Sequence, residues 1–269
     1  MSAPILDHKD PDAPSVFEPA ALLREARRQK GLPQAEVPAV CILDPDGDIV
    51  RHLRKSAQAR LSAHWPCYHT ELHEFSLAGR NCGIIGCAVG APFAVLVAEE
   101  LFALGCRLLI SLTSAGQINA VSNPPYFVVI DRALRDEGTS YHYAAPQAFA
   151  DADPKLVRAA VAALKDKDLP VHVGASWTTD APFRETREAI SAAQAKGVLA
   201  VEMEAAALYT FARAASRDVL CLAHVTNTMA VAEQDFEKGE ADGTVDALRV
   251  LDAIVEGLGS SMQETSQNS

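Results

Sequence analysis

The stretch Gly197–Phe211, GVLAVEMEAAALYTF, decides the fold of this chain. Its apolar first part predicts a buried strand over 198–202, and its alanine-rich second part predicts a helix from Met203 to about Ala215. Glu202 and Glu204 lie at the junction. Acids in a first helical turn interact favourably with the helix dipole, whereas acids at the carboxyl end of a strand often face a ligand crevice. Both interpretations are open at this point.

Buried strands and helices alternate on both sides of this stretch. Strands without polar alternation, separated by helices of 10–15 residues, are typical of a sheet covered on both faces. We therefore predict one α/β domain with a central mixed, largely parallel sheet and helices on both faces. The predicted strands are 37–43, 82–88, 107–112, 126–130, 171–175, 198–202 and 219–226, and a hairpin-like edge covers 64–80. The predicted helices are 17–30, 49–61, 93–104, 154–165, 184–196, 203–215 and 245–258.

No linker rich in Pro, Gly or Ser divides the chain. Residues 1–15 are polar and contain prolines, which predicts a flexible N-terminal arm. The domain is expected over residues 16–260, and residues 261–269 are expected to form a disordered tail.

The formal net charge of −11 argues against a nucleic-acid surface, because phosphate neutralisation needs clustered Lys and Arg. A small anionic ligand needs local basic residues to overcome this field. Neither a signal peptide nor an apolar membrane span is visible, and the six cysteines include no C-x-x-C pair. We expect a cytoplasmic protein with reduced thiols, no metal site and no membrane partner.

Small and hydroxyl residues follow three predicted strands, at 86–92 (GCAVGAP), 113–116 (TSAG) and 226–228 (TNT). Such turns let a backbone approach a ligand, although Gly90-Ala-Pro92 is also an ordinary helix start. No G-x-G-x-x-G follows the first strand, and no P-loop motif occurs. The segments 131–143 and 178–187 combine aromatic and polar side chains, as recognition of a flat heterocycle requires.

Five motifs in this order resemble the nucleoside phosphorylase superfamily, in the branch of the uridine phosphorylases and the hexameric purine nucleoside phosphorylases. They are GCAVGAP, TSAGQI, DEGTSYHY, WTTDAPFRETR and VEMEAAAL, and the resemblance covers about residues 37–258. It implies cleavage of the N-ribosidic bond of a nucleoside, most directly by phosphorolysis. It also implies no cofactor, inorganic phosphate as co-substrate, and a homo-oligomer (dimer, trimer or hexamer).

The resemblance implies a ribose site. Met203 and Glu204 match the family pair whose glutamate accepts the ribose hydroxyls, and a carboxylate accepts two such protons well. Glu202 matches the upstream glutamate of that pair. Thr113 matches a threonine that touches both ribose and phosphate.

The resemblance also implies a base site. Phe183, or less surely Pro182, matches the stacking aromatic, and Arg184 and Arg187 lie near the polar residues that read the base. Either arginine is equally compatible with a charge on a helix surface. Asn227 replaces the aspartate that protonates the base in hexameric purine enzymes, which predicts poor cleavage of adenosine.

The implied phosphate site, formed by Arg51, Thr113 and Gly90, is depleted of arginines. Ile110 stands where the family has one arginine, and a second, lent by a neighbouring subunit, is replaced around Tyr68 or His69. The early arginine of the family is either lost at Gly47 or kept as Arg51, depending on how the D-P-D-G-D turn at 44–48 is aligned.

Three functions follow from this depletion. Phosphorolysis is the leading hypothesis. If phosphate is not used, Asp44 or Asp48 could activate water in a nucleosidase. The third hypothesis is a non-catalytic nucleoside-binding protein of the same fold. In an oligomer, His69, His73 or residues 141–143 are candidates for completing a neighbour's site.

Overall fold

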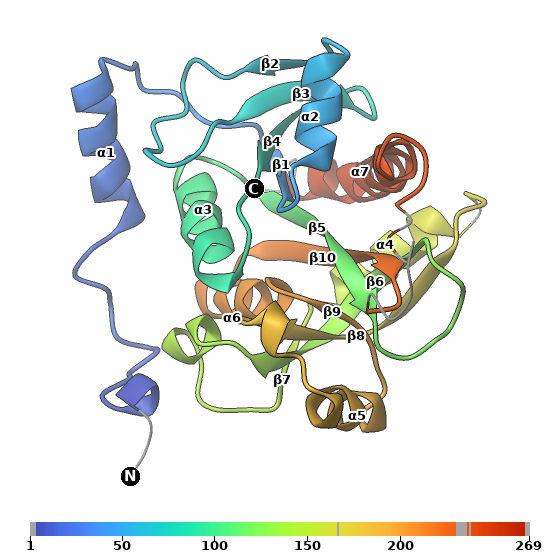
Figure 1. The fold of residues 1–269 in the computed structure, drawn as a ribbon. Coiled ribbons are helices and arrows are strands. Elements are labelled where there is room, and N and C mark those ends of the chain that lie inside the picture. The colour runs from blue at the N-terminus through green and yellow to red at the C-terminus, as the bar shows by residue number, and fades with distance from the viewer. Residues whose placement is uncertain (1–3, 166, 230–235, 237, 267–269) are drawn as a thin grey trace.

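The computed structural model describes residues 4–165, 167–229, 236 and 238–266 of the 269-residue chain. It contains one mixed sheet with helices on both faces (Figure 1). The predicted single α/β domain with a mixed, helix-covered sheet is therefore confirmed. The strands are β1 (Val40–Asp44), β2 (Ala59–Leu61), β3 (His73–Leu77), β4 (Arg80–Gly86), β5 (Leu108–Gln117), β6 (Tyr126–Asp136), β7 (Phe149–Asp151), β8 (Val171–Thr179), β9 (Val198–Glu202) and β10 (Asp218–Asn227).

Part of the sheet closes on itself. The strand order is β10-β6-β8-β9-β5-β1-β4-β3-β2, and β10 also pairs with β5. Five strands (β10, β6, β8, β9 and β5) therefore form a ring, from which β1, β4, β3 and β2 continue as an open arm. The sheet is less parallel than predicted, because β5 runs on to pair antiparallel with β9 and β6 runs antiparallel to β10.

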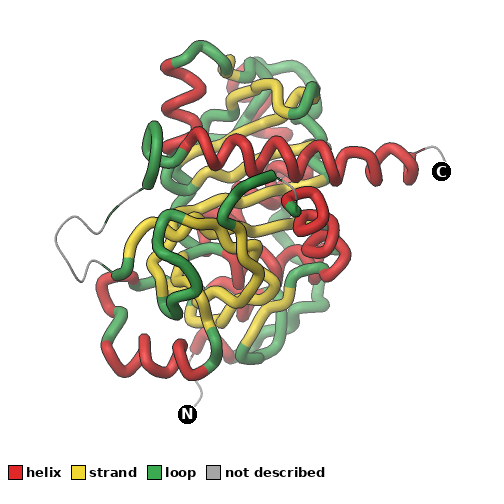
Figure 2. Tube along the Cα trace, turned by 90° about the vertical axis from the view of Figure 1, so that its right-hand side faces the viewer, coloured by secondary structure: helices red, strands yellow, loops and turns green. Residues whose placement is uncertain are grey.

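The helices form two layers. The α-helices are α1 (Pro19–Lys30), α2 (Asp48–Lys55), α3 (Ala91–Ala103), α4 (Pro154–Leu164), α5 (Arg187–Ala195), α6 (Ala205–Ala215) and α7 (Thr244–Ser266), and short 3₁₀ turns are η1 (Pro4–Leu6), η2 (Thr139–His142) and η3 (Pro182–Arg184). Helices α3 and α6 pack together on one side of the sheet, and α4 and α7 pack together on the other (Figure 1). Figure 2 shows that the long helix α7 crosses the molecule and projects beyond it.

Several element boundaries differ from the predictions. The TSAG segment 113–116 is the end of strand β5 and not a turn, and β6 continues to Asp136 into the predicted loop. Helix α2 ends at Lys55, because Ala57 adopts a left-handed conformation (φ 56°) before strand β2. Helix α7 covers part of the predicted C-terminal tail, and residues 230–235 and 237, between the last predicted strand and the last predicted helix, lie outside the described residues.

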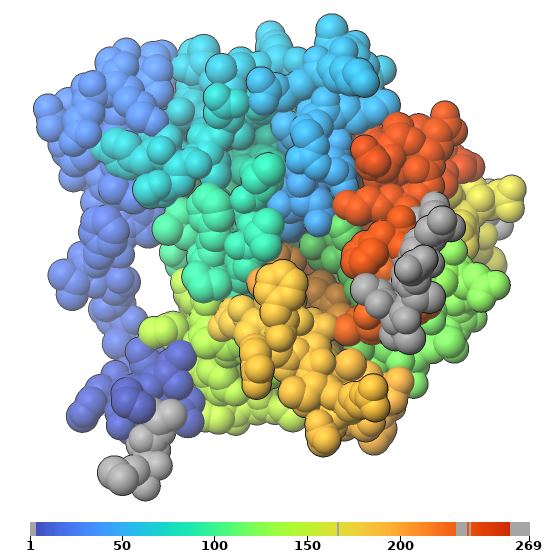
Figure 3. Space-filling model, viewed as in Figure 1, coloured from blue at the N-terminus to red at the C-terminus, as the bar shows by residue number. Residues whose placement is uncertain are grey.

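The N-terminal segment lies along one edge of the molecule, in dark blue in Figure 3. The Lys9 ammonium and the His142 ring nitrogen Nδ1 are 3.0 Å apart, which joins this segment to η2. Helix α1 contacts α3. Whether residues 1–15 behave as a flexible arm stays a prediction.

All six cysteines are unpaired thiols. Within the described ranges, none of the helices combines the length and the apolar character that crossing a bilayer requires.

Tyr209 of α6 joins this helix to the sheet. Its buried hydroxyl donates to the Ile130 carbonyl (2.6 Å) and accepts from the Cys221 N–H (2.9 Å). We expect Tyr209→Phe to lower the free energy of unfolding by about 1–3 kcal/mol, because both backbone groups lose a buried partner. Urea unfolding measures this loss. Tyr141→Phe is the control, because the Tyr141 hydroxyl makes only a long 3.5 Å contact. Equal losses in both variants contradict the assignment.

Candidate active site

A cavity of about 510 Å³ opens at the carboxyl ends of β5, β9 and β10. Its position, where neighbouring strands diverge, is the usual place for a ligand in an α/β sheet. The lining residues are Asp46, Ser114, Ala115, Gly116, Pro182, Phe183, Glu185, Val201, Glu202, Met203, Thr226, Asn227, Met229, Phe236 and Lys238. The GVLAVEMEAAALYTF stretch thus supplies one wall of the cavity.

Glu202 is fully engaged inside the protein. Its Oε1 accepts hydrogen bonds from the Ser176 hydroxyl (2.9 Å) and the Thr178 hydroxyl (2.5 Å). Its Oε2 accepts from the backbone N–H groups of Glu204 and Ala205, each at 2.7 Å. These four bonds occupy the acceptor capacity of the carboxylate. Glu202 thus fixes the turn that carries Met203 and Glu204, and its contact with ribose stays a prediction.

Glu204 has one satisfied and one unsatisfied oxygen. Its side chain is 1% exposed, and Oε1 accepts from the Gly90 N–H at 2.7 Å. Oε2 is buried and has no hydrogen-bond partner among the described residues. A buried acceptor without a donor is costly unless a ligand supplies the donor. Glu204 itself is not a lining residue of the cavity, but the neighbouring Met203 is, so contact between this oxygen and a ligand hydroxyl stays a prediction.

The electrostatic state of Glu204 is unusual. Burial and, after it, the negative charge of Glu202 together raise its pKa to about 8, while the N–H of Gly90 and the nearby Thr113 hydroxyl oppose the shift. Burial also raises the pKa of Glu202. A perturbed carboxyl group beside a cavity is a common mark of a functional site.

Gly90 and Thr113 lie beside Glu204, at the end of the cavity where ribose is predicted. The N–H of Gly90 donates to Glu204, so it is not free for an anion in this structure. Thr113 is buried, and its predicted contact with ribose and phosphate stays a prediction.

The residues predicted to contact the base include an aromatic side chain and an amide that line the cavity. Phe183 is 98% exposed and lines the cavity mouth, and Asn227 is buried in its wall. Arg184 and Arg187 are exposed and are not among the lining residues, so the structure does not bring them to the cavity. Sequence reasoning missed Glu185, a lining carboxyl whose pKa burial raises to about 7.

Asp44 supports the loop that follows β1. Its carboxylate accepts from the N–H groups of Gly47 (3.2 Å) and Val50 (2.9 Å). Burial raises its pKa to about 7, against the effect of the Val50 N–H. Asp44 is not a lining residue of the main cavity, so its predicted role as a base for water gains no support.

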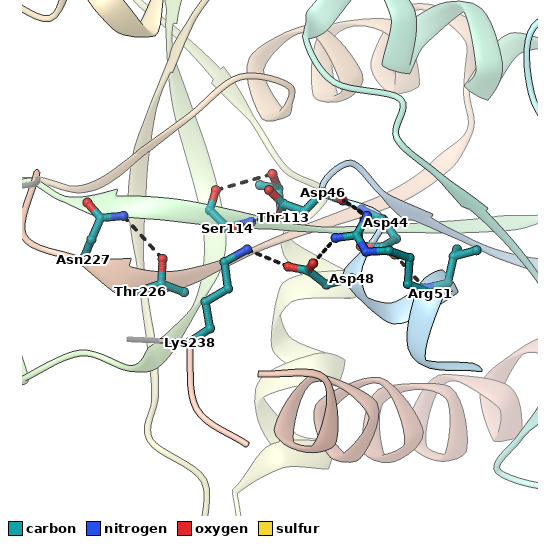
Figure 4. Close-up of polar contacts among 11 residues, drawn as sticks. Asp44, Asp46, Asp48, Arg51, Thr113, Ser114, Thr226, Asn227 and Lys238 are labelled. Atoms are coloured by element: carbon teal, nitrogen blue, oxygen red, sulfur yellow. Dashed lines mark hydrogen bonds and ion pairs between the residues drawn. The ribbon is translucent and has the colours of Figure 1, made fainter. Parts of the chain in front are cut away.

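Asp48 holds the two nearby cations (Figure 4). It forms an ion pair with Arg51, and its Oδ2 lies 2.5 Å from the Lys238 ammonium. Arg51 also donates to the Asp46 carbonyl at 3.1 Å. The predicted phosphate arginine is thus paired within its own loop. No periodic pattern in the sequence marks Lys238.

Asp46 is the main functional candidate that the sequence prediction missed. It lines the cavity, and its Oδ2 accepts from the Ser114 N–H at 2.6 Å. Its position in the D-P-D-G-D turn was the sequence feature that could have identified it, but only Asp44 and Asp48 of this turn were assigned roles. Strand β5 was also expected to end before Ser114.

The remaining candidates make contacts elsewhere in the chain. The Tyr143 hydroxyl bonds Glu99, Tyr141 lies under the Arg135 guanidinium, and His73 is buried in β3. Ile110 is buried in β5 and Tyr68 is half-exposed beside Lys30. A role for these residues in a neighbour's site stays a prediction.

The raised pKa of Glu204 predicts a pH-dependent stability. As pH rises from the unfolded value of 4.5 towards about 8, the unfolded chain loses this proton while the folded chain keeps it. The free energy of unfolding of the wild type should therefore fall relative to Glu204→Gln, by about 2 kcal/mol or more between pH 5 and 8. Urea unfolding at both pH values measures this, with the exposed Glu188→Gln as control. Parallel pH profiles for wild type and Glu204→Gln contradict the prediction.

The comparisons with known proteins agree with this geometry. The chain is similar to a guanosine phosphorylase of Halorubrum lacusprofundi (30% identity over 138 residues, 51% of this chain). It is also similar to a DeoD-type purine nucleoside phosphorylase of Proteus mirabilis (32% over 133 residues, 49% of this chain). A third relative is a uridine phosphorylase of Escherichia coli (29% over 148 residues, 50% of this chain). The matches span only 57%, 56% and 58% of these relatives.

A crystal structure of uridine phosphorylase from Vibrio fischeri has the same fold, with a TM-score of 0.72 at 21% identity. The alignment covers 87% of this chain and 99% of that one. The profile of the phosphorylase superfamily matches residues 39–256. With most of its length matched and the fold shared, the chain belongs to the phosphorylase superfamily.

Proposed function

We propose that this protein cleaves the N-ribosidic bond of a nucleoside by phosphorolysis, releasing a free base and ribose 1-phosphate. The carrying observation is the unpaired Glu204 Oε2, buried next to Met203 at the wall of a cavity of nucleoside size. A ribose hydroxyl is a donor of the right kind for this oxygen. Phe183 at the cavity mouth supports stacking of the base.

Phosphate as nucleophile is supported by the names of the relatives, all of which are phosphorylases. In the reaction the bond from C1′ to the base nitrogen breaks, its electron pair leaves with the base, and a phosphate oxygen bonds to C1′. The positive charge that develops on the sugar favours nearby carboxylates, and the departing base needs hydrogen-bond donors. In this proposal Glu204 faces the sugar and the Asn227 amide, which lines the cavity, faces the base.

Water is the less supported nucleophile. Asp44 and Asp48, the two bases considered for it, are occupied by backbone N–H groups and by two cations, respectively. A non-catalytic binding protein is supported only by the scarcity of free cations near the cavity.

The product assay tests the nucleophile. Guanosine, inosine and uridine should release base only when inorganic phosphate is present, and ribose 1-phosphate should form in equal amount. Free ribose, formed at the same rate without phosphate, contradicts phosphorolysis. Binding of a nucleoside without any base release supports the non-catalytic alternative.

Removal of the ribose acceptor should reduce turnover strongly. We expect Glu204→Ala to lower kcat/KM by about 10- to 100-fold when assayed above pH 8, where Glu204 is ionised, because a hydrogen bond from a ribose hydroxyl to the charged Oε2 is worth roughly 1.5–3 kcal/mol. Glu188→Ala, on the exposed face of α5, is the matched control and should leave kcat/KM unchanged. Equal kcat/KM values for Glu204→Ala and the control contradict the assignment of Glu204 as the ribose acceptor.

The amide of Asn227 predicts which nucleosides the protein cleaves well. Its amide cannot transfer a proton to a departing 6-aminopurine, whereas a base with a carbonyl group leaves more readily as an anion. We expect kcat/KM for adenosine to be about tenfold or more below that for inosine. Asn227→Asp should narrow this difference by raising turnover of adenosine. Comparable kcat/KM values for both nucleosides in the wild type contradict the prediction.

A further inference from the structure

The loop between β1 and α2 has a fixed backbone. The Asp44 carbonyl accepts from the N–H groups of Gly47 (2.9 Å) and Cys87 (3.0 Å), and its carboxylate holds Gly47 and Val50. Gly47 has a positive φ of 74°, and a Cβ at this position would lie 2.6 Å from the Cys87 sulfur. These constraints fix the backbone position of Asp46, which lies between Asp44 and Gly47 in this loop.

The Asp46 carboxylate fills a gap in the sheet. The pairing of β1 with β5 ends at Leu43 and Ser111, and the pairing of β9 with β5 begins only at Gly116. The N–H of Ser114 lies between these two pairings and has no strand partner on that side. Asp46 Oδ2 accepts this N–H at 2.6 Å.

This N–H is an anion-binding group beside the ribose end of the cavity. Ser114 lines the cavity and follows Thr113, whose hydroxyl interacts with Glu204. The charge of Asp46 also acts on Glu204, which shows that the two carboxyl groups are near each other. A phosphate that attacks C1′ must approach this part of the cavity.

The other anion-binding groups here are already used by carboxylates. Gly90 donates to Glu204, and Arg51 and Lys238 are both paired with Asp48 (Figure 4). Phosphate would therefore have to compete with Asp46 for the Ser114 N–H and with Asp48 for two cations that are already paired. A phosphate dianion in the same place would meet strong repulsion from Asp46.

We propose that Asp46 is an internal occupant of the phosphate subsite, and that phosphate binds by displacing its carboxylate from the Ser114 N–H. Asp46 is then the residue that determines the affinity for phosphate. After displacement, Ser114 N–H, the Thr113 hydroxyl and the two cations on Asp48 are the groups that face the anion. This inference rests on the proposed phosphorolysis only for the chemical identity of the anion.

The direct test is calorimetric titration of inorganic phosphate into the protein without a nucleoside. Asp46→Asn removes the charge and keeps the size, and we expect it to lower the Kd for phosphate at least tenfold relative to the wild type. Asp46→Glu keeps the charge and should bind phosphate as weakly as the wild type. Asp131→Asn, an exposed position on β6 outside the cavity lining, makes the same change in net charge and should have no effect.

The outcomes separate this inference from the proposed function. An unchanged or raised Kd in folded Asp46→Asn, with the fold checked by circular dichroism, overturns the inference even if ribose 1-phosphate is formed. An equal fall in Kd for Asp131→Asn also overturns it, because net charge alone then explains the effect. Conversely, tighter phosphate binding without any ribose 1-phosphate leaves the inference standing and refutes phosphorolysis.

Discussion

The buried carboxylate of Glu202 is the interaction on which the site depends. Its four hydrogen bonds join β8, through Ser176 and Thr178, to the junction of β9 and α6. An ionisable group at this depth is stable only with nearly all of its lone pairs satisfied. That requirement fixes the path of the chain between strand and helix. The same path places Met203 at the cavity, and it places the Glu204 carboxylate where it accepts the Gly90 N–H.

The neighbouring carboxylates divide into two groups with different tasks. The carboxylates of Glu202 and Asp44 accept hydrogen bonds from backbone N–H groups and so hold their turns in place. Glu204 and Asp46 each hold one N–H, of Gly90 and Ser114, respectively, and lie at or beside the cavity. Acidic residues dominate this region in a chain whose net charge is −11. Negative charge at this cavity therefore disfavours any anionic ligand relative to a neutral one.

The sequence predicted the fold better than it predicted the site. Apolar runs and helical periodicity placed the strands and most helices, because burial on both faces leaves a strong pattern. The closure of the ring by β5 and β10 is a long-range pairing with no local signature. The extension of β5 through Thr113–Gly116 escaped prediction for the same reason, since small and hydroxyl residues also favour turns.

Within the site, the motif VEME marked the two glutamates that are predicted to bind ribose but could not assign their separate contacts. Glu202 and Glu204 are two positions apart, and only the partners on β8 and on the Gly90 loop distinguish them. Similarly, D-P-D-G-D contains three aspartates, and the tertiary contact with Ser114 singles out Asp46. Lys238 comes from a polar segment without periodicity, so its ion pair with Asp48 has no counterpart in the sequence pattern.

The closed ring of strands has a consequence for folding. Strand β5 pairs with β10 across about 110 residues of chain, from Ser114 to His224, and contacts of such separation form slowly because loop closure costs entropy. The cavity walls from β5, β9 and β10 meet only when the ring is complete. Any ligand of this cavity therefore binds the complete ring and not a partly assembled chain, so that ligand present during refolding shifts the population toward the closed form by mass action.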